Sequence, residues 1–109
     1  MDLRRVQQEA WDNKLAHGFN TTDVPADLKR LHREVDEAEE AWQGGGENFG
    51  SELADGVIFL AGLAQTAGLD LGAEVKRKLA VNSERRYERL PDGRLVKAAP
   101  GADLDIEAG

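Results

Sequence analysis

The stretch LHREVDEAEEAWQGGGENFGSELAD, residues 31–55, contains two pairs of acidic residues separated by three consecutive glycines. Glu34 and Glu37 form the first pair, and Glu52 and Asp55 form the second. The members of a pair are three residues apart, so each pair lies on one face of a helix. The glycines are typical of a helix end and a turn. We therefore predict two antiparallel helices that bring the four carboxylates together, with each member of the first pair facing one member of the second.

Placing four carboxylates close together costs free energy. Like charges a few ångströms apart repel one another, and desolvation adds a cost to each charged group. Proton uptake or a divalent cation relieves this cost, and oxygen-only ligands suit hard cations such as Mg²⁺ or Mn²⁺. The alternative interpretation is two ordinary solvated faces, which is the usual meaning of one acidic pair in so acidic a chain. Two pairs in mirror register across a glycine turn favour the cation site.

Composition limits the classes of protein to be considered. The chain has 109 residues, of which 40% are hydrophobic, which suits one domain with a modest core. A formal net charge of -7 argues against nucleic acid or an anionic membrane as the main partner. The chain has no cysteine, so disulfides and thiolate metal sites play no part. Its start, MDLRR, is charged and precedes no apolar run, so we expect neither a signal peptide nor a transmembrane span, and a cytoplasmic location.

Hydrophobic periodicity and turn residues predict four helices. The first covers residues 2–16, and the second opens at Asp23 with a proline in its first turn. The third starts between residues 49 and 51, with Asn48 or Ser51 as its N-cap, and ends at a glycine. The fourth is capped by Asp70 and runs to about residue 87.

Two of these helices carry strong apolar patterns. In the second, large and small apolar residues recur at alternating spacings of three and four, which indicates one core-facing stripe. The third is apolar nearly all round after Gly56, so we expect it to be central or at a subunit interface. The stripe of the second helix consists of Leu28, Leu31, Val35, Ala38 and Trp42.

The C-terminal part of the chain lacks the helical periodicity of the preceding segments. Residues 91–93, Pro-Asp-Gly, are a turn signal that can join two short extended segments. From Ala98 on, the sequence is small, acidic and aperiodic. We therefore predict one domain over residues 1–97 and a flexible acidic tail over residues 98–109.

A second group of polar residues follows one face of the predicted fourth helix. Lys78, Asn82 and Arg85 are spaced by four and then three residues. Two cations and an amide in line can bind phosphate groups. The alternative is a basic helix C-terminus that interacts with the helix dipole.

Together these motifs resemble the MazG-like, all-alpha nucleoside triphosphate pyrophosphohydrolase superfamily. Its signature is Glu-Glu-x-x-Glu, a variable gap and Glu-x-x-Asp, which corresponds here to residues 33–37 and 52–55. The Asn82-x-x-Arg85 element is similar to the family's basic element, and the resemblance covers roughly residues 3–97. Arg33 stands where the family has its first Glu, and the spacing leaves Arg85 and Arg86 as alternatives for the basic position.

The resemblance implies an all-α fold, an antiparallel four-helix bundle-like subunit that is dimeric and sometimes tetrameric, with a short C-terminal extended turn. It implies Mg²⁺-dependent cleavage of a nucleoside triphosphate between its α- and β-phosphates, with Mn²⁺ as a possible substitute. One carboxylate, Glu37, is a candidate to orient the attacking water. The remaining implied roles are metal binding by Glu34, Glu37, Glu52 and Asp55, and phosphate binding by Lys78, Asn82 and Arg85.

A nucleotide substrate also needs a pocket for its base. Trp11 and Phe19 are aromatic candidates to stack on a base, and core or interface packing is the alternative for Trp11. Candidates to read the edge of the base are Asn13, His17 and Asn20.

Two other functions remain open at this stage. Because Arg33 replaces the expected Glu, the chain could be a non-catalytic helical dimer that acts as a regulatory or nucleotide-binding module. The other alternative is an enzyme related to phosphoribosyl-ATP pyrophosphatase, acting on a phosphoribosyl nucleotide. The sequence leaves the base, the sugar, the number of ions and the choice between dimer and tetramer undetermined.

Overall fold

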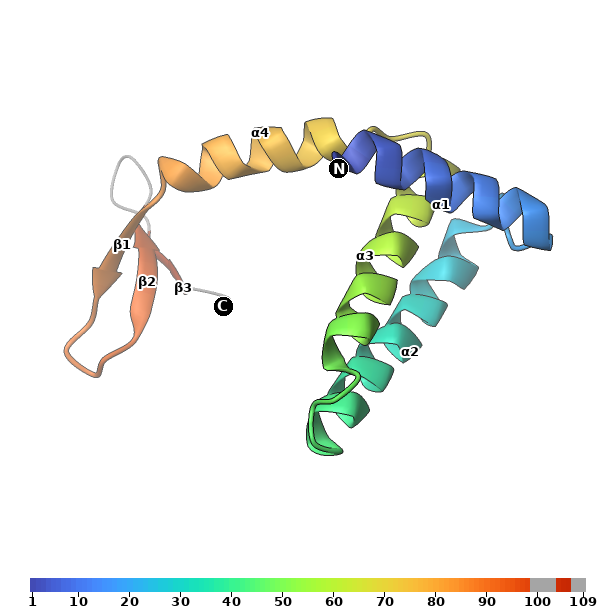
Figure 1. Ribbon diagram of the computed structural model, residues 1–109. Helices are drawn as coiled ribbons and strands as arrows, with labels where there is room; N and C mark the ends of the chain where they lie inside the picture. The colour runs from blue at the N-terminus through green and yellow to red at the C-terminus, as the bar shows by residue number, and fades with distance from the viewer. Residues whose placement is uncertain (99–103, 107–109) are drawn as a thin grey trace. The chain divides into compact units, whose positions relative to one another are not determined.

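The computed structural model describes residues 1–98 and 104–106 and contains four helices and a small sheet (Figure 1). The chain divides into two compact units, residues 1–74 and residues 75 onward. The expectation of one domain over residues 1–97 stays a prediction. The helices are α1 (Leu3–His17), α2 (Val24–Gln43), α3 (Phe49–Thr66) and α4 (Leu71–Ser83), and the strands are β1 (Arg86–Arg89), β2 (Leu95–Ala98) and β3 (Leu104–Ile106).

Side-chain caps explain where α1 and α2 begin. The Asp2 carboxylate accepts a hydrogen bond from the Arg5 amide at 2.8 Å, and the Asp23 carboxylate accepts one from the Ala26 amide at 3.1 Å. Each bond satisfies a backbone donor that a helix start leaves unpaired. Helix α1 ends at Gly18, whose φ of 69° is left-handed and favours glycine.

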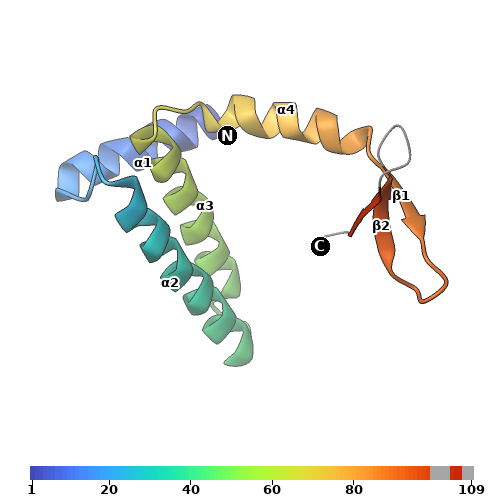
Figure 2. The same cartoon turned by 180° about the vertical axis from the view of Figure 1, so that it is seen from behind.

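Helices α2 and α3 form an antiparallel hairpin around the glycine-containing turn, as Figures 1 and 2 show from opposite sides. Gly45 and Gly46 have φ values of 115° and 80°, so this turn needs residues without a Cβ. The ring of Trp42 packs on that of Phe49 across the turn, with centroids 5.1 Å apart. Asn48 is the N-cap residue of α3, but its side chain makes no capping hydrogen bond.

In the first unit, both α1 and α2 pack against α3. The buried residues of α3 are four consecutive small or apolar positions, 61–64, near its C-terminal end. A Cβ added at Gly62 would lie 2.9 Å from the Cε of Lys14, so the absence of a side chain leaves room for the Lys14 side chain between α1 and α3. Helix α4 crosses the boundary between the units, so the packing of four helices into a bundle stays a prediction.

Much of the predicted apolar stripe is exposed in the single chain. On α2, Leu28, Val35 and Trp42 are 47%, 60% and 65% exposed. On α3, which the sequence predicts to be central or at a subunit interface, Leu53 and Val57 are 50% and 46% exposed. The prediction of a core-facing stripe on α2 is therefore wrong within the single chain for Leu28, Val35 and Trp42, because the packing of α2 against α3 leaves these side chains uncovered.

The predicted fourth helix is too long. It ends at Ser83, and the next two amides, of Glu84 and Arg85, donate to carbonyls three residues back, which tightens the last turn. Residues 86–89 then extend as β1. The i, i+4, i+7 alignment therefore holds for Lys78 and Asn82 but not for Arg85, which lies beyond the helix.

In the second unit, the three strands form an antiparallel sheet in the order β1-β2-β3. Tyr87 pairs with Lys97 and Lys97 with Asp105. Residues 99–103 and 107–109, part of the predicted flexible tail, lie outside the described residues. Residues 104–106 of that tail form β3, which differs from the expectation of an aperiodic segment. Strand pairing explains the difference, since it depends on a partner and not on local periodicity.

No single helix among the described residues is long and apolar enough to cross a membrane, although the bent pair of α3 and α4 meets both criteria together.

Candidate active site

The helical hairpin brings the predicted acidic residues together. Carboxylate oxygens of Glu34, Glu37 and Glu52 all lie within 4.8 Å of one another, and all three residues are half-buried. The first two come from α2 and the third from α3. Asp55, one turn beyond Glu52, is exposed and lines the same pocket as Glu34 and Glu37. The four side chains thus converge as a simple hairpin requires, while their roles stay a prediction.

The electrostatics of this acidic cluster, defined as Glu34, Glu37, Glu52 and Asp55, are unfavourable in the protein alone. Burial raises the pKa of Glu34 above its ordinary value, and the negative charges of the other three cluster members raise it further. Arg30, one turn earlier on α2, acts in the opposite direction and lowers it. A positive charge bound near Glu34 would therefore stabilise the ionised form of this carboxyl group.

The donor set fits a divalent cation. One carboxylate oxygen of Glu52, Oε2, is buried and has no hydrogen-bond partner. A buried acceptor left unpaired is costly, and a cation would satisfy it. All the available donors are carboxylate oxygens, the ligands that Mg²⁺ and Mn²⁺ prefer. Glu34, Glu37 and Glu52 can therefore hold such an ion, with Asp55 beside them.

A pocket of about 280 Å³ opens next to the acidic cluster and is formed entirely by α1, the α1–α2 connection, α2 and α3. Its volume is near the lower limit of small-molecule sites. Its lining combines acidic side chains with phenyl rings and amides, so it can take a ligand with both charged and flat groups. The pocket lining includes Asn13, Lys14, Phe19, Asn20, Asp27, Arg30, Glu34, Glu37, Asp55, Phe59 and Gly62.

Two phenylalanines line the pocket, Phe19 from the α1–α2 connection and the half-buried Phe59 from α3, and Phe19 is the more exposed of the two. The side chain of Phe19 is 52% exposed and its ring stacks on that of His17, with centroids 5.2 Å apart and planes at 20°. Asn13 lies on the same pocket from α1. Trp11 is half-buried and is not among the residues that line the pocket, so Phe19 is the predicted aromatic residue that lines it.

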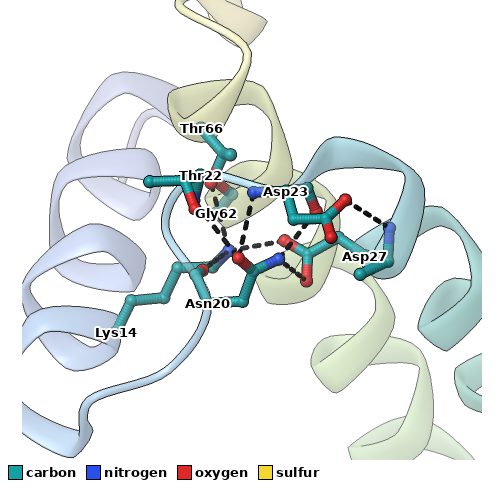
Figure 3. Close-up of polar contacts among 8 residues, drawn as sticks. Lys14, Asn20, Thr22, Asp23, Asp27, Gly62 and Thr66 are labelled. Carbon is teal, nitrogen blue, oxygen red and sulfur yellow. Dashed lines mark hydrogen bonds and ion pairs between the residues drawn. The ribbon is translucent and has the colours of Figure 1, made fainter.

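A buried ion pair forms another wall of the pocket (Figure 3). The Nζ of Lys14 lies 2.7 Å from the Asp27 carboxylate, and the two side chains are 10% and 7% exposed. Lys14 also donates to the Asn20 carbonyl at 2.9 Å and to the Thr66 hydroxyl at 3.2 Å. The Asn20 amide in turn donates to Asp27 at 3.1 Å. Helices α1, α2 and α3 and the α1–α2 connection are therefore joined at one point.

The predicted phosphate-binding residues lie in the other unit. Lys78 and Asn82 are exposed on α4, and Arg85 is half-buried after its end. Their role toward a phosphate stays a prediction.

Sequence reasoning did not identify Lys14, Asp27 or Arg30. Charged residues on helices usually face solvent, and a single Lys or Asp gives no periodic signal. The available clue was the proline-containing start of α2 next to a connection rich in polar residues. Arg30 had a clearer signal, because it lies four residues before Glu34, on the same helix face as the first acidic pair.

Comparison with known proteins gives two relevant similarities. No family model matches the chain. A dATP/dGTP diphosphohydrolase of Salmonella phage PMBT28 is 45% identical over 54 residues, which make up 50% of this chain and 19% of that protein. A cyanophage S-2L MazG-like pyrophosphohydrolase, solved with dGDP and three catalytic Mn²⁺ ions per active site, matches with a TM-score of 0.65. That match is 20% identical in sequence and covers 91% of this chain and 99% of the other.

Proposed function

We propose that this chain, which has the MazG-like fold, is a metal-dependent nucleotide pyrophosphohydrolase. The observation that carries the proposal is the convergence of Glu34, Glu37 and Glu52 within 4.8 Å beside a pocket that also contains an exposed phenyl ring. A nucleotide has charged phosphates and a flat base, which match the charged and flat groups of the pocket lining. The matched segment spans only 19% of the curated relative, so the reaction and the substrate of this chain are proposals.

The acidic cluster would hold one or more divalent cations, Mg²⁺ or Mn²⁺. A bound cation neutralises phosphate charge and lowers the pKa of a coordinated water. Glu37 belongs both to the cluster and to the pocket lining, so its carboxylate can accept a hydrogen bond from a water next to bound phosphate. Arg33 lies one residue outside this set and is exposed, so its replacement of the family's first Glu leaves the cluster intact.

Arg30 is the cation in the pocket that can contact phosphate. Its side chain is exposed, and its positive charge attracts the carboxylate of Glu34. A guanidinium group forms strong paired hydrogen bonds with phosphate oxygens. The other pocket cation, Lys14, already donates to three oxygen acceptors and has no donor left for a ligand.

The substrate that we propose is a purine deoxynucleoside triphosphate, cleaved between its α- and β-phosphates. The proposal draws on the relatives, one named for dATP and dGTP and the other solved with dGDP. In this chain Phe19 would stack on the base, and Asn13, with an amide that can both donate and accept, would contact its edge.

A homodimer is the second part of the proposal. Leu28, Val35 and Trp42 are seven residues apart in sequence and lie on one face of α2, and all are 47% or more exposed. Together with Leu53 and Val57 of α3, they present large apolar side chains on the hairpin. A monomer rarely leaves such a surface uncovered, and a symmetric partner covers it most simply.

Product analysis with a panel of nucleoside triphosphates tests the reaction. We expect Mn²⁺ or Mg²⁺ to support release of pyrophosphate and monophosphate, most rapidly from dATP or dGTP. Release of inorganic phosphate alone would show that a different bond is cut. Absence of turnover together with Mn²⁺ binding by calorimetry would favour the non-catalytic module, and sedimentation of the same sample tests the dimer.

A further inference from the structure

The α1–α2 connection is held to the helices by hydrogen bonds to the buried ion pair. Asn20 is the residue through which it is held: its carbonyl accepts from Lys14 at 2.9 Å, and its amide donates to Asp27 at 3.1 Å. Figure 3 shows these contacts meeting at one point between the three helices. Phe19, next in sequence to Asn20, is 52% exposed and lines the pocket. The amide of Phe19 also donates to the Lys14 carbonyl at 2.9 Å, so Phe19 is positioned by this bond to α1 and by its neighbour Asn20, which the polar network holds.

The side-chain amide of Asn20 is fully used within this network. The side-chain oxygen accepts from the Thr22 amide at 3.2 Å and the Asp23 amide at 3.0 Å. The side-chain nitrogen donates to the Asp23 carbonyl at 2.7 Å as well as to Asp27. Two donated and two accepted bonds leave no donor for a ligand. Asn20 therefore positions the connection and does not read a base, which leaves Asn13 for that role.

Stability alone does not account for the ion pair. Desolvating two charges is costly, and replacing a buried pair by apolar side chains of similar size is often neutral or stabilising. The pair also restricts its surroundings, because a Cβ at Gly62 would lie 2.9 Å from the Cε of Lys14. The close fit of Lys14 therefore indicates that the ion pair fixes the positions of neighbouring groups more than it stabilises the folded chain.

We propose that Lys14 and Asp27 are positioning residues that hold Asn20, and through it Phe19, as the base-binding wall of the pocket. They act on nucleotide affinity and base selectivity without touching the reacting phosphates. The inference rests on the proposed function for its nucleotide part, while its structural part, the anchoring of residues 19–23, can be measured without any substrate.

The test uses the full chain with the double substitution Lys14→Met and Asp27→Leu, which removes both charges and leaves neither unpaired. We expect the variant to fold. KM for the preferred nucleotide should rise about tenfold, which corresponds to the loss of about one or two hydrogen bonds that hold Asn20. The value of kcat should stay within about twofold, because the acidic cluster is unchanged. The ratio of kcat/KM between purine and pyrimidine nucleotides should fall.

A substrate-free measurement accompanies the kinetics. The Thr22 and Asp23 amides both donate to Asn20, so their hydrogen exchange reports on the connection. We expect exchange at these amides to accelerate about tenfold in the double variant. The matched control is Arg5→Gln with Glu9→Gln, which removes an exposed ion pair of the same helix and should change neither exchange nor KM.

Gly62→Ala provides an independent variant that keeps both charges. Its methyl group must displace Lys14, so KM and exchange should move in the same direction as in the double variant. Unchanged KM and unchanged exchange in either folded variant would overturn the inference. A fall in kcat at constant KM would also overturn it. Faster exchange in a protein that hydrolyses no nucleotide would support the anchoring and refute the proposed function instead.

Discussion

Replacing Glu34 by Gln should stabilise the protein in the absence of metal and weaken its response to metal. The substitution keeps the size of the side chain and removes one of three charges whose oxygens lie within 4.8 Å. At about 5 Å, two like unit charges repel by about 1 kcal/mol in water and about 3 kcal/mol at an effective dielectric constant of about 20. Because Glu34 is half-buried and also loses its attraction to Arg30, the lower value of about 1 kcal/mol applies.

The assay is thermal unfolding in EDTA and in Mn²⁺. A gain of about 1 kcal/mol raises Tm by about 4–8 °C for a domain of about 60–100 residues. In wild-type protein, Mn²⁺ at about 100 times its Kd adds about 2.7 kcal/mol to the free energy of unfolding. The variant should gain less, because it lacks one of the carboxylates that we propose to coordinate the ion. The order of the two Tm values should therefore reverse when Mn²⁺ is added. Glu40→Gln, the same change at an exposed site of α2, is the control and should have no such effect.

The dependence on pH follows from the same carboxyl group. Burial, followed by the charges of Glu37, Asp55 and Glu52, raises the pKa of Glu34 above its ordinary value of 4.5. The folded state thus holds this proton more tightly than the unfolded state, so charged Glu34 opposes folding above the raised pKa. Its contribution becomes favourable as the pH falls through that pKa toward 4.5. The advantage of Glu34→Gln in EDTA should shrink over this range, and an advantage that is absent at neutral pH would refute the electrostatic argument.

Three other substitutions test separate parts of the site and fold. Glu37→Gln should lower kcat by about 100-fold or more with the fold intact, and wild-type turnover would remove Glu37 from the reaction. Asp55→Asn should weaken Mn²⁺ binding about tenfold in calorimetry, and an unchanged Kd would place Asp55 outside the cation site. Phe19→Ala should raise KM about tenfold through lost stacking without affecting kcat, and an unchanged KM would show that the base binds elsewhere. Gly18→Ala should cost about 1 kcal/mol in denaturant unfolding, because its φ of 69° is strained for alanine; an equal midpoint would contradict this.

The helical hairpin and its acidic residues could be predicted from the sequence because all the signals are local. Acidic pairs at helical spacing, a proline in the first turn of α2 and glycines at the turn each act within a few residues. Two helices joined by a short turn have few ways to pack. The register of Glu34 and Glu37 with Glu52 then follows from counting residues on either side of the turn.

The remaining features depend on contacts between distant residues. The end of α4 at Ser83 reflects the pairing of Tyr87 with Lys97, which no helical pattern reveals. The Lys14–Asp27 pair joins residues from two helices across a connection, and each alone looks like a solvated charge. The stripe of α2 shows a different limit, since periodicity identifies an apolar face but not whether the same chain or another covers it.

One end of α3 is buried and the other is exposed. This difference explains why the proposed cation site and the proposed dimer surface lie on the same part of the hairpin. Residues 61–64 are buried near its C-terminal end, where α1 packs and the Lys14–Asp27 pair satisfies its own charges. The other end holds the repelling carboxylates together with exposed apolar side chains such as Leu53 and Val57. Neither problem is solved within the described residues of the single chain. The proposed cation would neutralise the carboxylates and the proposed second copy would cover the apolar surface, so both partners would bind at the same end of the hairpin.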